Sequence, residues 1–179
     1  LESLRRDGAR SAVLDLRMDP GGLLEQAVDV AGQFLPKGTL VVQTRGRMRG
    51  QDQSYHTDEP GAERNWPLVV LVDRGSASAS EIVAGALQDL DRALVIGRTT
   101  FGKGSVQSVF PLRGNNAALK LTTSLYYTPS GRSIHRAVRD SLAQGEEDEE
   151  SVVTPAAPPD TAPPRFRTRG GRTVYGGGG

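Results

Sequence analysis

The stretch V-D-R-G-S-A-S-A-S-E-I-V-A-G-A-L-Q-D, residues Val72 to Asp89, joins an apolar run to a helical pattern through three serines that alternate with alanine. The run that leads into it, Pro67 to Asp73, is rich in β-branched residues and is typical of a buried strand. From Ile82 onward, apolar residues recur at helical spacing. The stretch therefore predicts a strand, a sharp turn and a helix.

The same order of elements recurs outward from this stretch. The sequence predicts strands over Ala12–Arg17, Thr39–Thr44 and Ala93–Gly97, a helix over Leu23–Leu35, a loop or edge hairpin over Arg45–Trp66, and a hairpin of Val106–Leu112 and Ala117–Leu125 around the turn Arg113–Asn116. Strands that alternate with helices favour an open α/β sheet. In such sheets, functional residues gather where strands end and helices begin, as at Asp19–Gly22 and Arg74–Ser78.

The composition is that of a folded domain with almost balanced charge. The 179 residues include 22 basic and 21 acidic ones, so no basic surplus indicates nucleic acid or an anionic membrane as a partner. The absence of cysteine excludes thiol catalysis and zinc–cysteine sites, and His56 and His135 show no metal-ligand spacing. We expect no metal or other cofactor. No apolar run approaches the about 20 residues of a membrane span.

The character of the sequence changes after Asp140. Residues 145–150 form an acidic run and residues 155–164 a Pro-rich one, which together favour a solvated, disordered linker. The run R-T-V-Y at 172–175 suggests a strand that returns before the final glycines. We therefore expect a folded core over residues 1–140, a disordered insertion over 141–164, and a continuation of the core over 165–179.

The serines between strand and helix have a structural and a functional interpretation. Ser78 and Glu81 fit the capping box S-x-x-E, and Ser76 could cap the helix as well. Alternatively, one serine is a nucleophile, because unpaired amides at a helix N-terminus can hold the oxyanion formed when a serine attacks a carbonyl. The context is similar to the G-x-S-x-G nucleophile elbow without matching it.

A nucleophilic serine needs a base, and neither histidine lies in a motif suited to that role. A lysine can replace histidine if it is neutral, which requires lowering a pKa that is ordinarily about 10.4. Of the 22 basic residues 19 are arginine, so the three lysines stand out. Lys37 lies in a helix stop and Lys120 alternates with leucines as a solvent-facing strand residue does. Lys103, between two glycines on a loop, is the best candidate.

The loop that contains Lys103, G-R-T-T-F-G-K-G at Gly97–Gly104, nearly matches a nucleotide-binding P-loop. Two features oppose that alternative. Gly104 stands where a P-loop has its magnesium-binding hydroxyl, and the residues that follow read as a strand instead of a phosphate-binding helix. Gln107, on that expected strand, could hydrogen-bond the Lys103 amine.

Several motifs in a fixed order now suggest a family. L-D-L-R-x-x-P-G-G, G-S-A-S-A-S-E-I-V-A-G-A-L-Q-D, G-x-x-T-F-G-K-G-S-V-Q and L-Y-Y-T-P-S-G-R-S-I together resemble the carboxy-terminal processing peptidases, or tail-specific proteases, of peptidase family S41. The resemblance covers roughly Ala12 to His135. It implies a crotonase/ClpP-like fold, a β-β-α superhelix, and endoproteolysis near protein C-termini by a serine–lysine dyad.

The resemblance also implies roles for particular residues. The middle serine, Ser78, would be the nucleophile, Lys103 the general base and Gln107 the residue that orients Lys103. The backbone amides of Ala79 and of one glycine of the P-G-G turn would form the oxyanion hole, and we expect Gly22 to be that glycine. Ser76 and Ser80 would keep structural roles.

This chain departs from the family pattern in two respects. A PDZ domain usually precedes the protease core, and a G-I-x-P-D stretch usually follows the last motif; neither is present here, so we expect the chain to be a fragment of a longer protein. The resemblance implies unfolded or C-terminally exposed proteins as substrates and a bacterial envelope or periplasmic location, and it is compatible with a homo-oligomer. A non-catalytic module that binds peptides or ligands on the same fold remains the main alternative.

Overall fold

A computed structural model describes residues 1–47, 50, 52–63, 65–112, 117–136 and 162–179. The acidic run at 145–150, most of the Pro-rich run at 155–164 and the expected hairpin turn at 113–116 lie outside the described residues.

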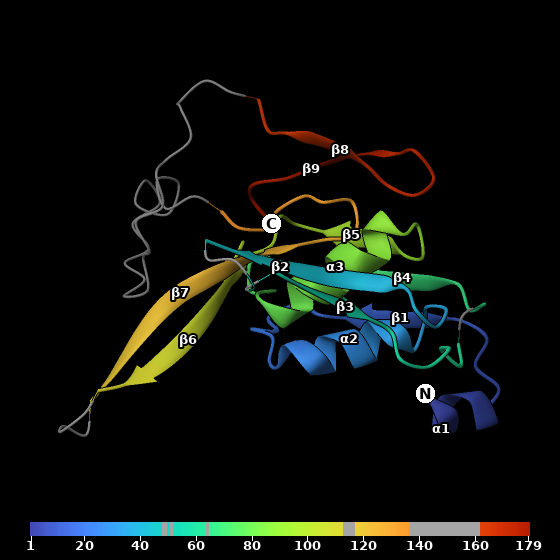
Figure 1. The fold of residues 1–179 in the computed structure, drawn as a ribbon. Coiled ribbons are helices and arrows are strands. Elements are labelled where there is room, and N and C mark those ends of the chain that lie inside the picture. The colour runs from blue at the N-terminus through green and yellow to red at the C-terminus, as the bar shows by residue number, and fades with distance from the viewer. Residues whose placement is uncertain (48–49, 51, 64, 113–116, 137–161) are drawn as a thin grey trace.

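Two sheets and two helices form the body of the molecule (Figure 1). A parallel sheet has the order β1-β4-β5, and an antiparallel sheet has the order β3-β2-β7-β6. The parallel sheet consists of β1 (Ala12–Asp15), β4 (Leu68–Val72) and β5 (Leu94–Gly97). The antiparallel sheet consists of β2 (Leu40–Gly46), β3 (Gln53–His56), β6 (Ser105–Pro111) and β7 (Ala118–Tyr127). The two helices of the body are α2 (Leu24–Gly32) and α3 (Ala79–Asp89), and a short helix, α1 (Glu2–Arg6), precedes β1.

The division into two sheets differs from the single open sheet that the strand and helix pattern suggests. Strand β2 pairs with β3 on one edge and with β7 on the other, both antiparallel. Because both of its edges are occupied, β2 has none left for the parallel sheet. The segment 45–66, expected to be a loop or an edge hairpin, supplies β3 and so completes a hairpin with β2.

Helix α3 lies at the centre of the fold. Every residue of α3 except Gln88 is buried, because the helix contacts α2, β2 of one sheet and β5 of the other. Its small residues make this enclosure feasible: a Cβ added at Gly85 would lie 2.9 Å from Thr128 Cγ2. The residue at its N-terminus, Ser78, is therefore held on a rigid, fully packed element.

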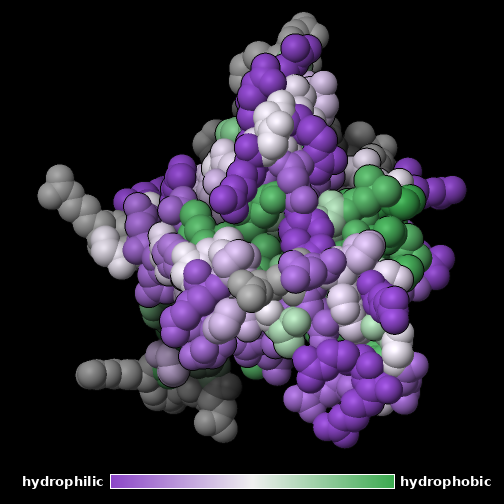
Figure 2. All heavy atoms as spheres, turned by 90° about the vertical axis from the view of Figure 1, so that its right-hand side faces the viewer, coloured by the Kyte–Doolittle hydropathy of each residue, from purple (hydrophilic) through white to green (hydrophobic). Residues whose placement is uncertain are grey.

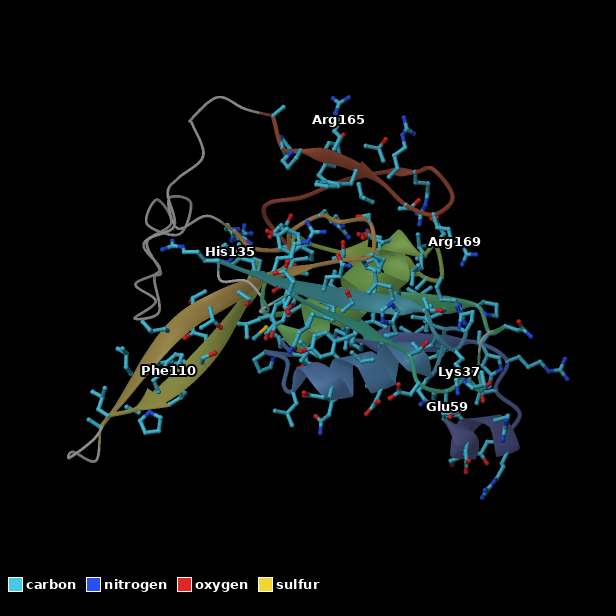
Figure 3. All side chains as sticks on the ribbon, in the orientation of Figure 1. Lys37, Glu59, Phe110, His135, Arg165 and Arg169 are labelled. Carbon is cyan, nitrogen blue, oxygen red and sulfur yellow. The ribbon has the colours of Figure 1, made fainter. Side chains whose placement is uncertain are left out.

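The β6–β7 hairpin projects from the body (Figures 1 and 3). Several of its apolar side chains are exposed, among them that of Phe110, which lies well out along the hairpin. Lys103 and Gln107 belong to its inner end, since β6 begins at Ser105. The hairpin thus begins next to the candidate site residues Lys103 and Gln107.

A short hairpin close to the C-terminus is formed by β8 (Arg165–Arg167) and β9 (Thr173–Tyr175), which pair only with each other. It docks on the C-terminal end of α3, where Arg169 N donates to the Asp89 carbonyl at 2.7 Å and Arg172 pairs with Asp91. In Figure 2 its polar side chains form the top of the molecule, and hydrophobic side chains gather at the right-hand edge of that view.

Candidate active site

The serine turn, Asp73–Ser78, connects β4 to α3. Ser78 is the N-cap of α3, with φ of 55° and ψ of −116°. A positive φ is uncommon for a residue other than glycine, and such strained backbones cluster at functional sites. Ser76 is fully buried and its hydroxyl donates to the Leu16 carbonyl at 2.7 Å, which ties the turn to the end of β1. Ser76 is structural, as expected, while Ser78 is half-exposed.

The glycine turn, Asp19–Gly22, interlocks with the serine turn. Ala77 N donates to the Asp19 carbonyl at 3.0 Å. Gly21 has a φ of 89°, and a Cβ added there would lie 2.5 Å from Ala77 O and 2.6 Å from Ala79 N. Only glycine therefore allows the two turns to approach so closely. The contact places Gly21 beside the first amide of α3.

The lysine loop, Arg98–Gly104, packs on the other side of the serine turn. Phe101 N donates to the Ser76 carbonyl at 3.0 Å. Lys103 is half-buried between the buried residues Gly102 and Gly104. The loop thus comes to the serine turn from the C-terminal end of β5, and it leads directly into β6.

Glu81 joins the serine turn to the lysine loop. Its side chain accepts four hydrogen bonds, and the residue is only 2% exposed. Oε2 accepts from the backbone amides of both Ser78, at 2.9 Å, and Lys103, at 2.8 Å. Oε1 accepts from the Thr100 hydroxyl at 2.6 Å and from Gly102 N at 2.7 Å. One carboxylate oxygen is therefore shared by the backbones of the candidate nucleophile and the candidate base.

The electrostatics of Glu81 follow from this burial. Burial raises the pKa of the Glu81 carboxyl above its usual range, and the hydrogen bonds from Thr100, Gly102, Ser78 and Lys103 oppose that rise. Four hydrogen-bond donors compensate the burial of this carboxylate. Loss of one donor would leave part of the buried charge without a partner and would lower the stability of the fold. The arrangement thus favours a fixed spacing between the two loops.

Sequence reasoning placed Glu81 only in a capping box. The capping box is present, with the Ser78 amide donating to the Glu81 side chain. The three further donors come from Thr100, Gly102 and Lys103, which are about twenty residues away along the chain. The capping box accounts for Glu81 within its own helix. Its position in the sequence therefore did not predict that its carboxylate also binds the lysine loop.

Gln107 and the two histidines complete the set of candidates. Gln107 is half-buried on β6, opposite Thr122 and next to a register shift that follows Val106. His56 lies exposed on the edge strand β3. The backbone of His135 packs against the lysine loop, since a Cβ added at Gly104 would lie 2.5 Å from His135 N. Burial lowers the pKa of His135.

A small cavity of about 170 Å³ opens beside the glycine turn and the start of α3. Gly22 and Ala79, the candidate oxyanion donors, contribute to its wall. Much of the remaining wall is apolar and includes Leu16, Leu23, Ala27, Val30 and Val83. The cavity can therefore take an apolar side chain whose backbone carbonyl lies at the two amides.

Among the described residues, no group of three or more His, Cys, Asp or Glu side chains is arranged to hold a metal ion. No helix in the part of the chain that the structure describes is long and apolar enough to cross a membrane.

Replacing Glu81 with glutamine is expected to lower kcat of the full-length protein about 10- to 100-fold. A glutamine offers one carbonyl oxygen, so its NH₂ group must face amide donors that the carboxylate now accepts. The two donors that face the NH₂ group then lose their acceptor, which loosens the attachment between the serine turn and the lysine loop. Peptide cleavage kinetics would measure the effect. An unchanged kcat would show that the carboxylate does not set the geometry.

The model of peptidase family S41 matches residues 1–141, and the chain belongs to this family. It is 55% identical over 128 residues to a carboxy-terminal-processing protease of Bartonella bacilliformis. It is 46% identical over 136 residues to a carboxyl-terminal-processing protease of Synechocystis. The resemblance inferred from the motifs is confirmed.

The fold comparison agrees. A photosystem II D1 C-terminal processing protease matches with a TM-score of 0.66 at 38% sequence identity, over 74% of this chain. The expected S41 protease fold is therefore confirmed. The chain spans 34% of that structure, 29% of the Bartonella relative and 31% of the Synechocystis relative. It thus corresponds to about a third of each of these proteins.

Proposed function

We propose that the full-length protein is a serine endopeptidase that cleaves proteins near their C-termini, with Ser78 as nucleophile and Lys103 as general base. The observation that carries this proposal is the Glu81 carboxylate, whose Oε2 accepts from the amides of both residues. The strained backbone of Ser78 at the start of a buried helix supports the same assignment.

In the proposed reaction, the Ser78 hydroxyl attacks the scissile carbonyl carbon while the Lys103 amine accepts the hydroxyl proton. The lysine then returns this proton to the leaving amine, and water hydrolyses the resulting ester on Ser78. Gln107 orients the Lys103 amine. The mechanism needs no metal or cofactor.

The oxyanion is proposed to lie between the amides of Ala79 and Gly22. Ala79 N is the first amide of α3, where unpaired donors and the helix dipole favour negative charge. The Gly21 amide already donates to Asp19 Oδ1 at 3.0 Å, which favours Gly22 as the second donor. Such preorganised donors are commonly the largest contribution to acyl-transfer catalysis.

The substrates are proposed to be unfolded or C-terminally exposed proteins. The largely apolar cavity beside Gly22 and Ala79 favours an apolar side chain just before the cleaved bond. We propose a cell-envelope or periplasmic location, with which the bacterial relatives are compatible. We further propose that residues 1–140 and 165–179 form parts of one core interrupted by the insertion 141–164, and that nucleic acid is not a partner. An assembly of identical subunits is compatible with this proposal.

Two alternatives make different predictions. A non-catalytic binding module on the same fold would bind peptides without cleaving them. A P-loop nucleotide binder would need magnesium, and the β-strand that follows the lysine loop opposes it, because a P-loop leads into a helix.

Chelation of divalent metal separates these functions. The full-length protein should cleave an unfolded protein with an apolar C-terminus at the same rate with and without EDTA. Gel electrophoresis of the products over time measures this rate. Loss of cleavage on chelation would contradict a serine–lysine mechanism, and peptide binding without cleavage would favour the binding module.

A further inference from the structure

We propose that the buried ion pair between Asp89 and Arg132, at the opposite end of α3 from Ser78, positions the lysine loop for catalysis. The pair acts through the strap, residues Thr128–Arg136, which follows β7 and passes over α3 (Figure 1). The catalytic consequence rests on the proposed role of Lys103, whereas the mechanical coupling does not.

The ion pair fixes the strap to the end of α3. Arg132 Nε donates to Asp89 Oδ1 at 3.0 Å, and the two side chains are 8% and 0% exposed. Asp89 Oδ2 also accepts from Ser130 N at 3.1 Å, and Arg132 Nη2 donates to Gln88 Oε1 at 2.6 Å. Breaking a buried pair by removing one partner leaves an uncompensated charge, which is strongly unfavourable. The strap therefore has one well-defined position on the helix.

The other end of the strap holds the lysine loop. Arg136 N donates to the Gly102 carbonyl at 2.9 Å, and Arg136 Nη2 donates to the Thr100 carbonyl at 3.1 Å. Gly104 packs against the backbone of His135 so closely that no side chain fits between them. Figure 3 places His135 beside the inner end of the β6–β7 hairpin. Each residue that flanks Lys103 thus touches the strap.

The lysine loop is consequently held from both ends of one helix. Glu81, in the first turn of α3, binds the amides of Gly102 and Lys103. Asp89, two turns further on, holds the strap that binds the carbonyl side of the same loop. Ser78 is attached to the same helix. The distance between nucleophile and base is therefore set by α3, provided that both attachments hold.

The strap is held partly by close packing, since Ile134 belongs to the buried core, and partly by the polar attachments at its two ends. A cavity of about 210 Å³ lies between part of the strap, α3 and the lysine loop, with Glu81, Thr100, Arg132 and Ile134 among its lining residues. The strap has room to shift into this space if the ion pair is weakened. A misplacement of about 1 Å can cost roughly 100-fold in rate.

The same end of α3 provides a matched control. Arg172 pairs with Asp91 at 2.5 Å and donates to the Gln88 carbonyl, which holds the β8–β9 hairpin on the end of the helix and not on the strap. Arg172→Lys therefore weakens a neighbouring arginine–aspartate pair and leaves in place the bonds from Arg136 to the lysine loop. Arg132→Lys keeps the charge but loses the forked geometry that reaches Asp89, Gln88 and the Tyr175 carbonyl together.

The test compares wild type, Arg132→Lys and Arg172→Lys in the full-length protein by two measurements. Peptide cleavage should show kcat about 10-fold lower for Arg132→Lys, with KM changed by less than about 2-fold, because the peptide-binding surface is untouched. Hydrogen exchange should show faster exchange of the Gly102 and Lys103 amides in this variant only. Arg172→Lys should match wild type in both measurements.

Three results would overturn the inference. Arg132→Lys could leave kcat and the exchange of both amides unchanged, it could lower stability and kcat in parallel with Arg172→Lys, or it could raise KM instead of lowering kcat. Hydrogen exchange does not need proteolysis, so it tests the coupling even if the proposed function fails. If wild type cleaves through Ser78 and Arg132→Lys is unaffected, only this inference is wrong.

Discussion

Ser78→Ala is expected to lower cleavage by the full-length protein at least about 1,000-fold, because a nucleophile has no substitute among neighbouring side chains. The residual rate would come from the oxyanion donors and from substrate binding. Cleavage of an unfolded protein with an apolar C-terminus, followed by mass spectrometry of the products, measures the effect. Cleavage at the wild-type rate would remove Ser78 from the mechanism.

Ser76→Ala provides the contrast. The Ser76 hydroxyl bridges the Leu16 carbonyl and Asp73 N inside the protein, so its loss should cost about 1–3 kcal/mol of stability. Ser78→Ala should lower the melting temperature less, because it removes at most a helix cap worth about 1 kcal/mol. The two substitutions should therefore have different effects. Ser76→Ala should reduce mainly stability, and Ser78→Ala should reduce mainly activity.

Gly21→Ala is expected to cause the second-largest loss, in both stability and activity. The new Cβ would meet Ala77 O and Ala79 N at 2.5 and 2.6 Å, and the backbone φ of 89° disfavours any L side chain. Separating the two turns should cost about 2–4 kcal/mol of folding free energy. It should lower kcat about 100-fold or more, because the oxyanion donors move apart.

Gly22→Ala is the matched change one residue further on. A Cβ at Gly22 meets only Gln26 Oε1, at 3.8 Å, so thermal stability should remain close to that of wild type. Thermal unfolding of both variants tests the argument. Equal melting temperatures for the two would show that the glycine turn and the serine turn are not as closely interlocked as the contacts indicate.

Local patterns predicted much of the fold. The stretch 72–89 predicted a strand, a turn and a helix, and β4 and α3 have this order around Ser78. The hairpin expected over 106–125 is present as β6 and β7. The sequence did not predict that β2 belongs to a second, antiparallel sheet, because this depends on its pairing with β7, which lies far along the chain. Strand pairing across such separations has no local signature.

The candidate site was predictable where it depended on motifs and not where it depended on tertiary contacts. The motif resemblance assigned roles to Ser78, Ala79, Gly22, Lys103 and Gln107, of which Lys103 and Gln107 were already candidates from the local sequence, and all these roles stay proposals. The second function of Glu81 could not be predicted, because three of its four donors lie on the lysine loop. The same is true of Arg132, whose buried partner Asp89 is more than forty residues away.

The most direct test of the serine–lysine dyad compares wild type, Lys103→Ala and Lys103→Arg in the full-length protein on one unfolded substrate. Arginine is of similar length but is always protonated, so it cannot act as a base. The account predicts cleavage by wild type alone. Cleavage that survives in Lys103→Arg would mean that the base lies elsewhere and that the dyad is wrong.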